Sequence, residues 1–171
     1  LVLIAFWGFF GRNTRAFFFC LWQVQGAAGV GMAAFYGLNE LVCRILGLLN
    51  AGQVNLNDQA ILTRLGTSPR STILMVVFLA PVVEEALFRG YVFGNLREYS
   101  RGAAYLASCL FFAMVHVWPF FAESWDMGCL MVMGQYLVPG AVMAWAYEKS
   151  GSLWGSVLLH CAVNGLAVWG A

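Results

Sequence analysis

The chain contains 171 residues, of which 61% are hydrophobic and 10% are charged, and its mean hydropathy is +0.76. Because a soluble domain carries about 25% charged residues, this composition excludes an ordinary soluble protein and is typical of an integral membrane protein. Nine basic and eight acidic residues give a net charge of +1, so there is no basic excess of the kind that accompanies a nucleic-acid partner. We therefore expect a single membrane domain over residues 1–171, with membrane lipids as partners and no nucleic acid.

The start of the chain is predicted to hold the end of one membrane span and the whole of a second. Residues 1–10 are apolar and begin with Leu, so we expect them to be the tail of a span that starts in a longer chain. A short polar break with Arg12, Asn13 and Arg15 follows. Residues 16–39 then carry no charge, a run of about 24 residues that is long enough to cross a hydrocarbon core of about 30 Å.

Residues 50–71 form the longest polar interval and are predicted to hold a short interfacial helix. Apolar residues recur at helical spacing within it. Asn57 or Asp58 can cap the start of the helix, and Gly66 followed by Pro69 can end it. An amphipathic helix of this kind lies in the membrane interface. A plain surface loop is the alternative interpretation of the same residues.

The second half of the chain contains four further apolar segments, which we expect to cross the membrane. They cover about residues 72–96, 102–121, 127–147 and 153–169. Because links this short join neighbouring helices, the segments predict an antiparallel bundle. The expected fold is therefore all-α, a polytopic transmembrane helical bundle of about five to six spans, in which residues 72–169 form the core that carries the polar motifs.

Three ionisable side chains lie together in the first of these segments, at Glu84, Glu85 and Arg89. A charge at the centre of a membrane helix costs about 2.5 to 3.5 kcal/mol, so we expect these groups to face the bundle interior and to pair. Glu85 and Arg89 are four residues apart with the acid first, a spacing that favours an ion pair. Glu84 points about 100° away around the helix and is the carboxylate left free for chemistry. The alternative is a polar seam between helices with no chemical role.

The two histidines of the chain lie in other apolar segments, and we expect them to meet Glu84 in the folded protein. His116 ends the run F-F-A-M-V-H, and His160 opens the run H-C-A-V-N, which places Asn164 one helical turn later on the same face. Each of these polar groups is costly in an apolar bundle unless they meet. If they meet, Glu84 and His116 can take a proton from water by general base catalysis. His160 and Asn164 can then donate hydrogen bonds to the oxyanion of an amide, so the set has the parts needed for peptide hydrolysis.

Other chemistries remain open for the same region. Glu84, His116 and His160 can also ligate zinc and leave one position for water, although H-E-x-x-H is absent. We favour water activation without a cofactor over zinc. Ser156 lies one turn before His160, but G-x-S-x-G is absent, and a serine bonded to the helix backbone is the more typical reading. Cys161 is adjacent to His160, and adjacent helical residues do not face each other.

The three polar motifs resemble those of a known protein family. Residues 84–89, E-E-A-L-F-R, are similar to E-E-x-x-x-R, residues 112–116, F-A-M-V-H, to F-x-x-x-H, and residues 160–164, H-C-A-V-N, to H-x-x-x-N. These are motifs of the CAAX protease and bacteriocin-processing family, also called Abi or type II CAAX prenyl endopeptidase-like. The flanks F-L-A-P-V-V, R-G-Y-V-F-G-N-L and S-G-S-L-W look similar too, and the resemblance covers about residues 75–166.

The resemblance implies an all-helical intramembrane endopeptidase. It assigns roles to the positions already singled out: water activation to Glu84 and His116, the oxyanion site to His160 and Asn164, and support of the site to Glu85 and Arg89. Eukaryotic relatives trim prenylated C-terminal tails, whereas prokaryotic members are linked to peptide maturation, bacteriocin self-immunity or regulated membrane proteolysis.

The expected substrate is therefore a membrane-associated or lipid-modified peptide. Short polar links favour a compact member from a prokaryotic cell membrane. Two other classes stay open. One is an immunity protein that binds a peptide without cutting it. The other is a small transporter, which requires a polar route across the membrane, whereas the polar groups here gather in one cluster.

Overall fold

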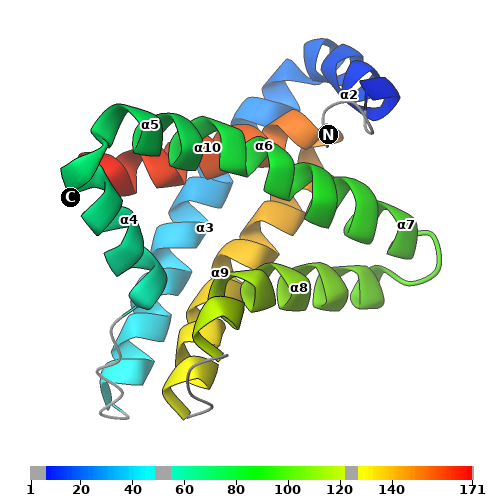
Figure 1. The fold of residues 1–171 in the computed structure, drawn as a ribbon. Coiled ribbons are helices and arrows are strands. Elements are labelled where there is room, and N and C mark those ends of the chain that lie inside the picture. Colours follow the sequence, from blue (N-terminus) through cyan, green and yellow to red (C-terminus); the bar gives the residue numbers. More distant parts are fainter. Residues whose placement is uncertain (1–6, 49–54, 122–126, 171) are drawn as a thin grey trace.

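The structure is a computed structural model that describes residues 7–48, 55–121 and 127–170, and all regular structure in these ranges is helical (Figure 1). In chain order the elements are α2 (Trp7–Phe19), α3 (Leu21–Leu48), α4 (Leu56–Thr67), α5 (Pro69–Ile73), η1 (Leu74–Leu79), α6 (Ala80–Glu85), η2 (Ala86–Phe93), α7 (Gly94–Leu96), α8 (Arg101–Phe121), α9 (Met127–Ser150) and α10 (Leu153–Trp169). α9 packs against α3, α8 and α10. The predicted all-α helical bundle is confirmed.

Three helices of the described residues are long and apolar enough to cross a membrane: Pro69–Leu96, Arg101–Trp118 and Leu130–Ser150. α2 and α3 together also pass this test, but they meet at an angle of 93°, so they add a fourth span only if the bent pair counts as one. α10 is apolar but has 17 residues, about 26 Å of helix, which is slightly shorter than a hydrocarbon core. The expectation of five to six spans also counted α10 and an earlier span that ends within residues 1–10, of which residues 1–6 lie outside the described ranges.

The four predicted spans of the second half correspond to helices of the structure. The first begins at Pro69, three residues before the predicted start, because proline is well suited to the first turn of a helix. The third extends to Ser150 instead of residue 147. The fourth, α10, has the predicted bounds.

The polar residues near the start of the chain lie inside α2, so the predicted polar break is wrong. Asn13 is buried, and its side-chain oxygen accepts a hydrogen bond from the backbone N–H of Leu153 at 2.7 Å. Its backbone oxygen accepts one from Ser152 Oγ at 3.0 Å. α2 thus helps to cap the N-terminus of α10 and satisfies its own polar group. The chain turns instead at Cys20, which divides the predicted span 16–39 between α2 and α3.

A helix does form in the polar interval, but its cap lies earlier than predicted. α4 is capped by Asn55, whose Oδ1 accepts hydrogen bonds from the backbone N–H groups of Asn57 at 3.1 Å and Asp58 at 3.3 Å. Ser68 ends α4, and Pro69 starts the next helix at once. The loop alternative is therefore wrong for the described part of this interval, while its place in the membrane interface stays a prediction.

The helix from Pro69 to Leu96 contains two π-helical stretches, η1 and η2, on either side of α6. π-Turns inside α-helices are frequent at functional sites, and α6 carries Glu84 and Glu85 at its end. Pro81 has no backbone N–H for the helix ladder and its ring crowds the preceding turn, which accounts for the irregular stretch before it.

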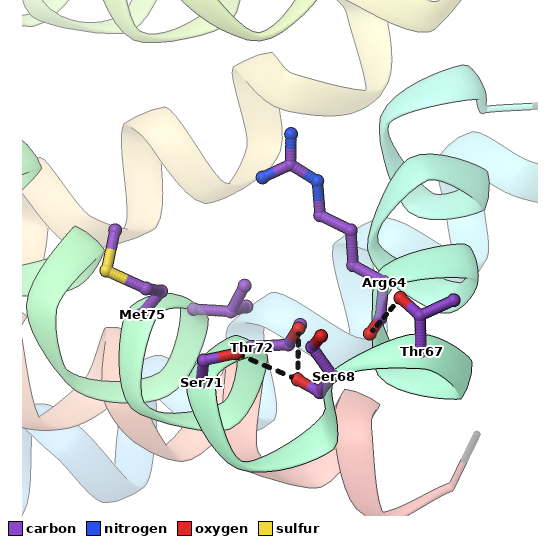
Figure 2. A pocket seen from close by; sticks show the side chains of 7 residues that line it. Arg64, Thr67, Ser68, Ser71, Thr72 and Met75 are labelled. Carbon is purple, nitrogen blue, oxygen red and sulfur yellow. Dashed lines mark hydrogen bonds between the residues drawn. The ribbon is translucent and has the colours of Figure 1, made fainter.

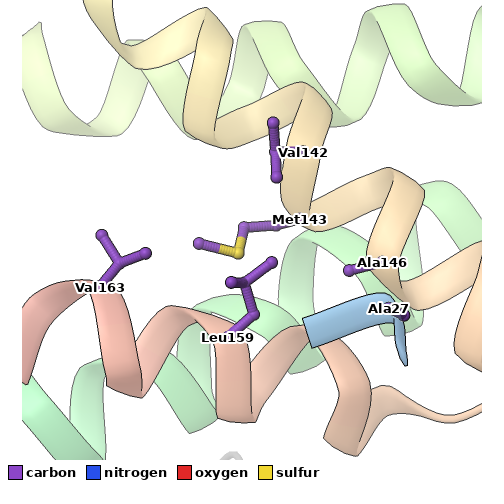
Figure 3. Packing of buried hydrophobic residues seen from close by; sticks show 6 residues of the cluster. All are labelled: Ala27, Val142, Met143, Ala146, Leu159 and Val163. Atoms are coloured by element: carbon purple, nitrogen blue, oxygen red, sulfur yellow. The ribbon is translucent and has the colours of Figure 1, made fainter. Parts of the chain in front are cut away.

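The apolar core lies where α3, α9 and α10 meet (Figure 3). Its buried members are Ala27, Val142, Met143, Ala146, Leu159 and Val163. The helix Pro69–Leu96 packs against α8 and α10. Its junction with α8 includes a buried hydrogen bond from Ser108 Oγ to the Phe88 carbonyl at 3.0 Å. These contacts place the polar face of the helix Pro69–Leu96 toward α8, α9 and α10.

Candidate active site

The predicted ion pair between Glu85 and Arg89 is confirmed and fully buried. Arg89 Nη1 donates to Glu85 Oε1 at 2.8 Å, and both side chains are 0% exposed. Arg89 Nη2 also donates to the Gly140 carbonyl on α9 at 2.9 Å. The guanidinium carbon lies 4.6 Å from the centre of the Phe112 ring on α8. One arginine therefore joins three helices while neutralising a buried carboxylate.

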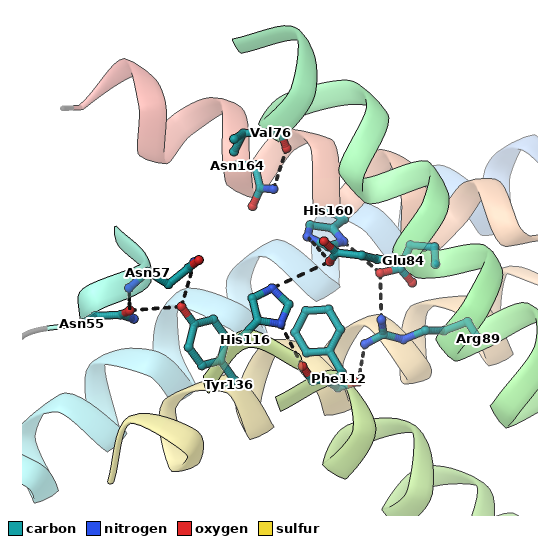
Figure 4. Close-up of polar contacts among 12 residues, drawn as sticks. Asn55, Asn57, Val76, Glu84, Arg89, Phe112, His116, Tyr136, His160 and Asn164 are labelled. Atoms are coloured by element: carbon teal, nitrogen blue, oxygen red, sulfur yellow. Dashed lines mark hydrogen bonds and ion pairs between the residues drawn. The ribbon is translucent and has the colours of Figure 1, made fainter. Parts of the chain in front are cut away.

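Glu84 faces both histidines, as the sequence predicted. Its Oε2 lies 3.8 Å from His116 Nε2 and 3.9 Å from His160 Nε2. This oxygen is buried and has no hydrogen-bond partner within the described residues. The three side chains come from α6, α8 and α10 and point toward one another in Figure 4. Tertiary packing thus brings together three of the four predicted catalytic residues.

The partners of the Nδ1 atoms indicate how each imidazole presents its other nitrogen. His116 Nδ1 lies 2.8 Å from the Phe112 carbonyl, and a carbonyl can only accept, so Nδ1 carries the proton. His160 Nδ1 lies 2.8 Å from Glu85 Oε1, whose carboxylate is paired with arginine, and the same assignment follows. Both neutral rings then direct an Nε2 lone pair toward Glu84. The predicted role of His160 as an oxyanion donor therefore requires its doubly protonated form.

The charges at the site do not cancel when both imidazoles are neutral. Glu84 and Glu85 carry two negative charges, and Arg89 carries one positive charge. An uncompensated charge in an apolar bundle is costly, so one further positive charge stabilises the cluster.

Asn164 lies on α10 one turn after His160, but its amide is engaged elsewhere. Its Nδ2 donates to the Val76 carbonyl at 2.9 Å. It makes no hydrogen bond to Glu84 or to either histidine in the described part of the chain, and Figure 4 shows it apart from them. The second N–H of this amide is the donor that it retains for a ligand.

Sequence reasoning missed Tyr136 on α9. Its ring stacks on His116 with centroids 4.5 Å apart and an interplanar angle of 25°. Its hydroxyl bonds to Asn55 and Asn57 at the start of α4. A half-buried tyrosine in an apolar helix needs a hydrogen-bond partner for its hydroxyl, and this need could have pointed to Tyr136 in the sequence.

The alternative nucleophiles receive no support. Ser156 is buried and donates to the Leu153 carbonyl at 3.0 Å, as the backbone interpretation predicted. Cys161 is half-buried beside His160 in sequence and is not part of a disulfide in the described residues. A carboxylate and two imidazoles are a suitable donor set for zinc. However, no group of three or more His, Cys, Asp or Glu side chains in the described ranges is arranged to hold a metal ion.

A pocket of about 280 Å³ opens between the end of α4 and the start of the helix Pro69–Leu96 (Figure 2). It is lined by Arg64, Thr67, Ser68, Ser71, Thr72, Met75 and Val76. The hydroxyls of Thr67, Ser71 and Thr72 donate to helix carbonyls, and Arg64 is the one charged residue in the lining of this pocket. The pocket adjoins the site through Val76, the partner of Asn164, and no predicted catalytic side chain lines it.

Comparison with known proteins identifies a family for this arrangement. A family model described as type II CAAX prenyl endopeptidase Rce1-like matches residues 67–166, which include all three polar motifs and more than half of the chain. UPF0177 protein YxdF from Lactococcus lactis subsp. lactis (strain IL1403) is 31% identical over 86 residues, or 50% of this chain and 42% of the relative. The chain thus spans less than half the length of this curated relative. No solved structure matches.

Proposed function

Because the chain belongs to the type II CAAX prenyl endopeptidase Rce1-like family, we propose that it is an intramembrane endopeptidase in which Glu84 and His116 activate water. Its apolar helices and its family both indicate an integral membrane protein. The observation that supports the mechanism is the position of Glu84 Oε2, which faces both Nε2 atoms at 3.8 and 3.9 Å. These distances are too long for direct hydrogen bonds and are compatible with polar groups that one water molecule bridges.

The lone pairs on these atoms determine how a water molecule is held. Water donates one hydrogen to the Glu84 carboxylate and the other to Nε2 of His116, which leaves an oxygen lone pair free for attack. As that oxygen bonds to the peptide carbonyl carbon, Glu84 takes the proton and the carbonyl π electrons move to oxygen. The C–N bond then breaks, and Glu84 returns the proton to the departing nitrogen. The products are a carboxylic acid and an amine, so the step balances without an oxidant or reductant.

The developing oxyanion requires hydrogen-bond donors. We assign this role to protonated His160 through Nε2 and to the second N–H of Asn164. Glu85 accepts from His160 Nδ1 and holds the ring toward the site. Arg89 in turn pairs with the buried Glu85. This division leaves Glu84 as the only carboxylate of the cluster that acts directly on the substrate.

We propose membrane-associated or lipid-modified peptides as substrates, because the catalytic groups lie on helices that are apolar enough to cross a membrane. Peptide maturation and bacteriocin self-immunity are the proposed settings, in a prokaryotic cell membrane. These settings derive from the family resemblance.

Glu84→Gln tests the mechanism, since it keeps the side-chain shape and removes the base. We expect turnover of a mixed set of prenylated and unmodified membrane peptides in proteoliposomes, read by mass spectrometry, to fall by about 10²- to 10⁴-fold. Glu40→Gln on α3 is the matched control, because Glu40 is exposed and, among the residues that the structure describes, it pairs with Arg44, one turn away. Cleavage by Glu84→Gln at the unmodified rate contradicts the proposal. If the unmodified protein binds these peptides without cutting them, the immunity protein is the better explanation.

Zinc is the second candidate for water activation, because Glu84, His116 and His160 are the donor types of catalytic zinc sites. Histidine ligands of metals also donate from their other nitrogen to a carboxylate or carbonyl, as both rings do here. Metal analysis of the purified protein, together with activity in a strong chelator, separates the two mechanisms. Retained activity at a metal content far below one ion per chain supports Glu84 as a metal-free base.

A further inference from the structure

The two histidines at the site are held in different ways. His160 is oriented by a buried carboxylate, because its Nδ1 bonds Glu85 Oε1 at 2.8 Å. His116 donates from Nδ1 to the Phe112 carbonyl, one turn earlier in its own helix, at 2.8 Å. A bond to a neutral carbonyl is weaker than one to a carboxylate. The orientation of the His116 ring therefore depends more on the groups that pack against its faces.

Two aromatic rings of the described residues pack against His116. The Phe112 ring lies 4.5 Å from it, centroid to centroid, at an angle of 39°. The Tyr136 ring lies at the same distance but is closer to parallel, at 25°. Figure 4 shows His116 between these two rings, with Nε2 directed to Glu84. Phe112 belongs to the same helix as His116, so Tyr136 is the contact that tertiary structure adds.

Tyr136 is itself held by the first turn of α4. Its hydroxyl donates to Asn55 Oδ1 at 3.2 Å and accepts from Asn57 Nδ2 at 3.1 Å. Asn55 Oδ1 is also the acceptor that caps α4. The two asparagines precede Tyr136 by 81 and 79 residues, so these bonds join α4 to α9 across the fold. Because the hydroxyl proton is already donated, Tyr136 does not act as a donor to substrate in this arrangement.

From these contacts we infer that Tyr136 is a positioning residue for His116, and that Asn55 and Asn57 hold it in place. Docking of α4 and the reactive orientation of His116 are then coupled: when the start of α4 moves away, the Tyr136 ring loses its anchor and Nε2 is free to turn from Glu84. This inference rests on the proposed function. Orientation matters at this level because a displacement of about 1 Å at a catalytic group can cost about 100-fold in rate.

A charge effect from α4 is the competing explanation. Asp58 follows Asn57, and its carboxylate interacts with His116 whenever that ring is protonated. Although the Asp58 side chain is exposed, desolvation by the surrounding protein raises the pKa of its carboxyl group, and His116 opposes that shift. Asp58→Asn removes this charge and leaves Tyr136 and its two bonds in place. The variant therefore separates electrostatics from positioning.

The first experiment measures kcat and KM for four variants of the full chain in proteoliposomes. We expect Tyr136→Phe and Asn57→Ala each to lower kcat by about three- to tenfold with little change in KM, since each removes a bond that anchors the ring. The double variant of Tyr136→Phe and Asn57→Ala should lose no more kcat than Tyr136→Phe alone, because both changes break the same link. Tyr136→Leu also removes the stacked ring and should lower kcat by about 100-fold.

Two controls accompany these variants. Tyr105→Phe on α8 also removes a tyrosine hydroxyl that bonds across helices, to Glu148 at 2.8 Å, and should keep kcat within about twofold. Asp58→Asn should do the same. If the losses in kcat of the two single variants add up in the double variant, the link through the hydroxyl is overturned. If Asp58→Asn lowers kcat as much as Tyr136→Phe does, a charge effect explains the result and positioning is overturned.

The second experiment does not depend on activity. The chain has only two histidines, so selective ¹⁵N labelling gives two imidazole rings in an NMR spectrum. We expect Tyr136→Phe and Asn57→Ala to broaden or shift the His116 signals and to leave those of His160, which Glu85 holds, unchanged. If the unmodified protein cuts no peptide, the proposed function fails while this spectrum still tests the positioning. An unchanged His116 signal in Asn57→Ala and Tyr136→Phe overturns it.

Discussion

Loss of Arg89 should destabilise the protein far more than loss of the proposed base. Arg89→Ala leaves Glu85 as a buried charge with 0% exposure, and it removes the bond to the Gly140 carbonyl and the contact with Phe112. Breaking a buried ion pair from one side costs about 3 to 5 kcal/mol. A typical protein has about 5 to 15 kcal/mol of net stability, so this cost is a large share of the total. Glu84→Gln replaces a partly exposed side chain by one of the same shape and should cost about 1 kcal/mol or less.

The measurement is the melting temperature in detergent micelles, followed by the fluorescence of the seven tryptophans, together with the amount of protein in the membrane at equal expression. We expect Arg89→Ala to melt well below the unmodified protein and to accumulate poorly, and Glu84→Gln to behave normally. The rescue variant combines Arg89→Met with Glu85→Gln. It removes both charges and keeps an oxygen acceptor for His160, so it should recover a large part of the lost stability.

Two results refute this reasoning. If Arg89→Ala and Glu84→Gln melt at the same temperature, the buried pair does not support the site in the way assigned. If the double variant is no more stable than Arg89→Ala, the cost arises from lost packing of the long arginine side chain and not from a stranded carboxylate.

Two further predictions concern the packing around the site. Gly140→Ala places a Cβ 3.1 Å from the Cys109 Cα on α8 and should lower the free energy of unfolding by about 1 to 3 kcal/mol in melting experiments. Gly134→Ala, in the same helix, places a Cβ that meets nothing within 4 Å, so it should be neutral or slightly stabilising. Equal melting temperatures for these two variants contradict a close approach of α8 and α9. Asn13→Ala leaves the Leu153 N–H without its acceptor and should cost about 1 to 3 kcal/mol, with faster hydrogen exchange in the first turn of α10. Arg12→Ala is the exposed neighbouring control, and the same exchange rate in both variants argues against capping of α10 by α2.

The polar motifs could be predicted from the sequence because the membrane allows few alternatives for a charge. Four-residue spacing of Glu85 and Arg89 in an apolar helix predicts a pair, and the structure confirms it at 2.8 Å. The cost of isolated histidines in apolar segments predicts that they meet Glu84, and Nε2 of each lies within 4 Å of it. Family motifs agree with this grouping, and the match over residues 67–166 confirms the family.

Contacts across long separations could not be predicted in this way. Asn13 reads as part of a polar break, yet it is buried and caps α10. Asn164 carries the expected spacing from His160, but its amide bonds to Val76. Tyr136 belongs to no motif, because a ring that stacks on His116 is recognised only once α8 and α9 are in contact.

An all-helical membrane protein, its main helices and the residues that must avoid lipid can therefore be predicted from the chain, because burial costs act on each residue wherever it lies in the fold. The nitrogen of each histidine that faces Glu84, and the helix that holds Tyr136, follow only from how the helices pack. Hydrogen bonds are directional and short, so their partners depend on the placement of helices to within about an ångström, which local sequence patterns do not specify.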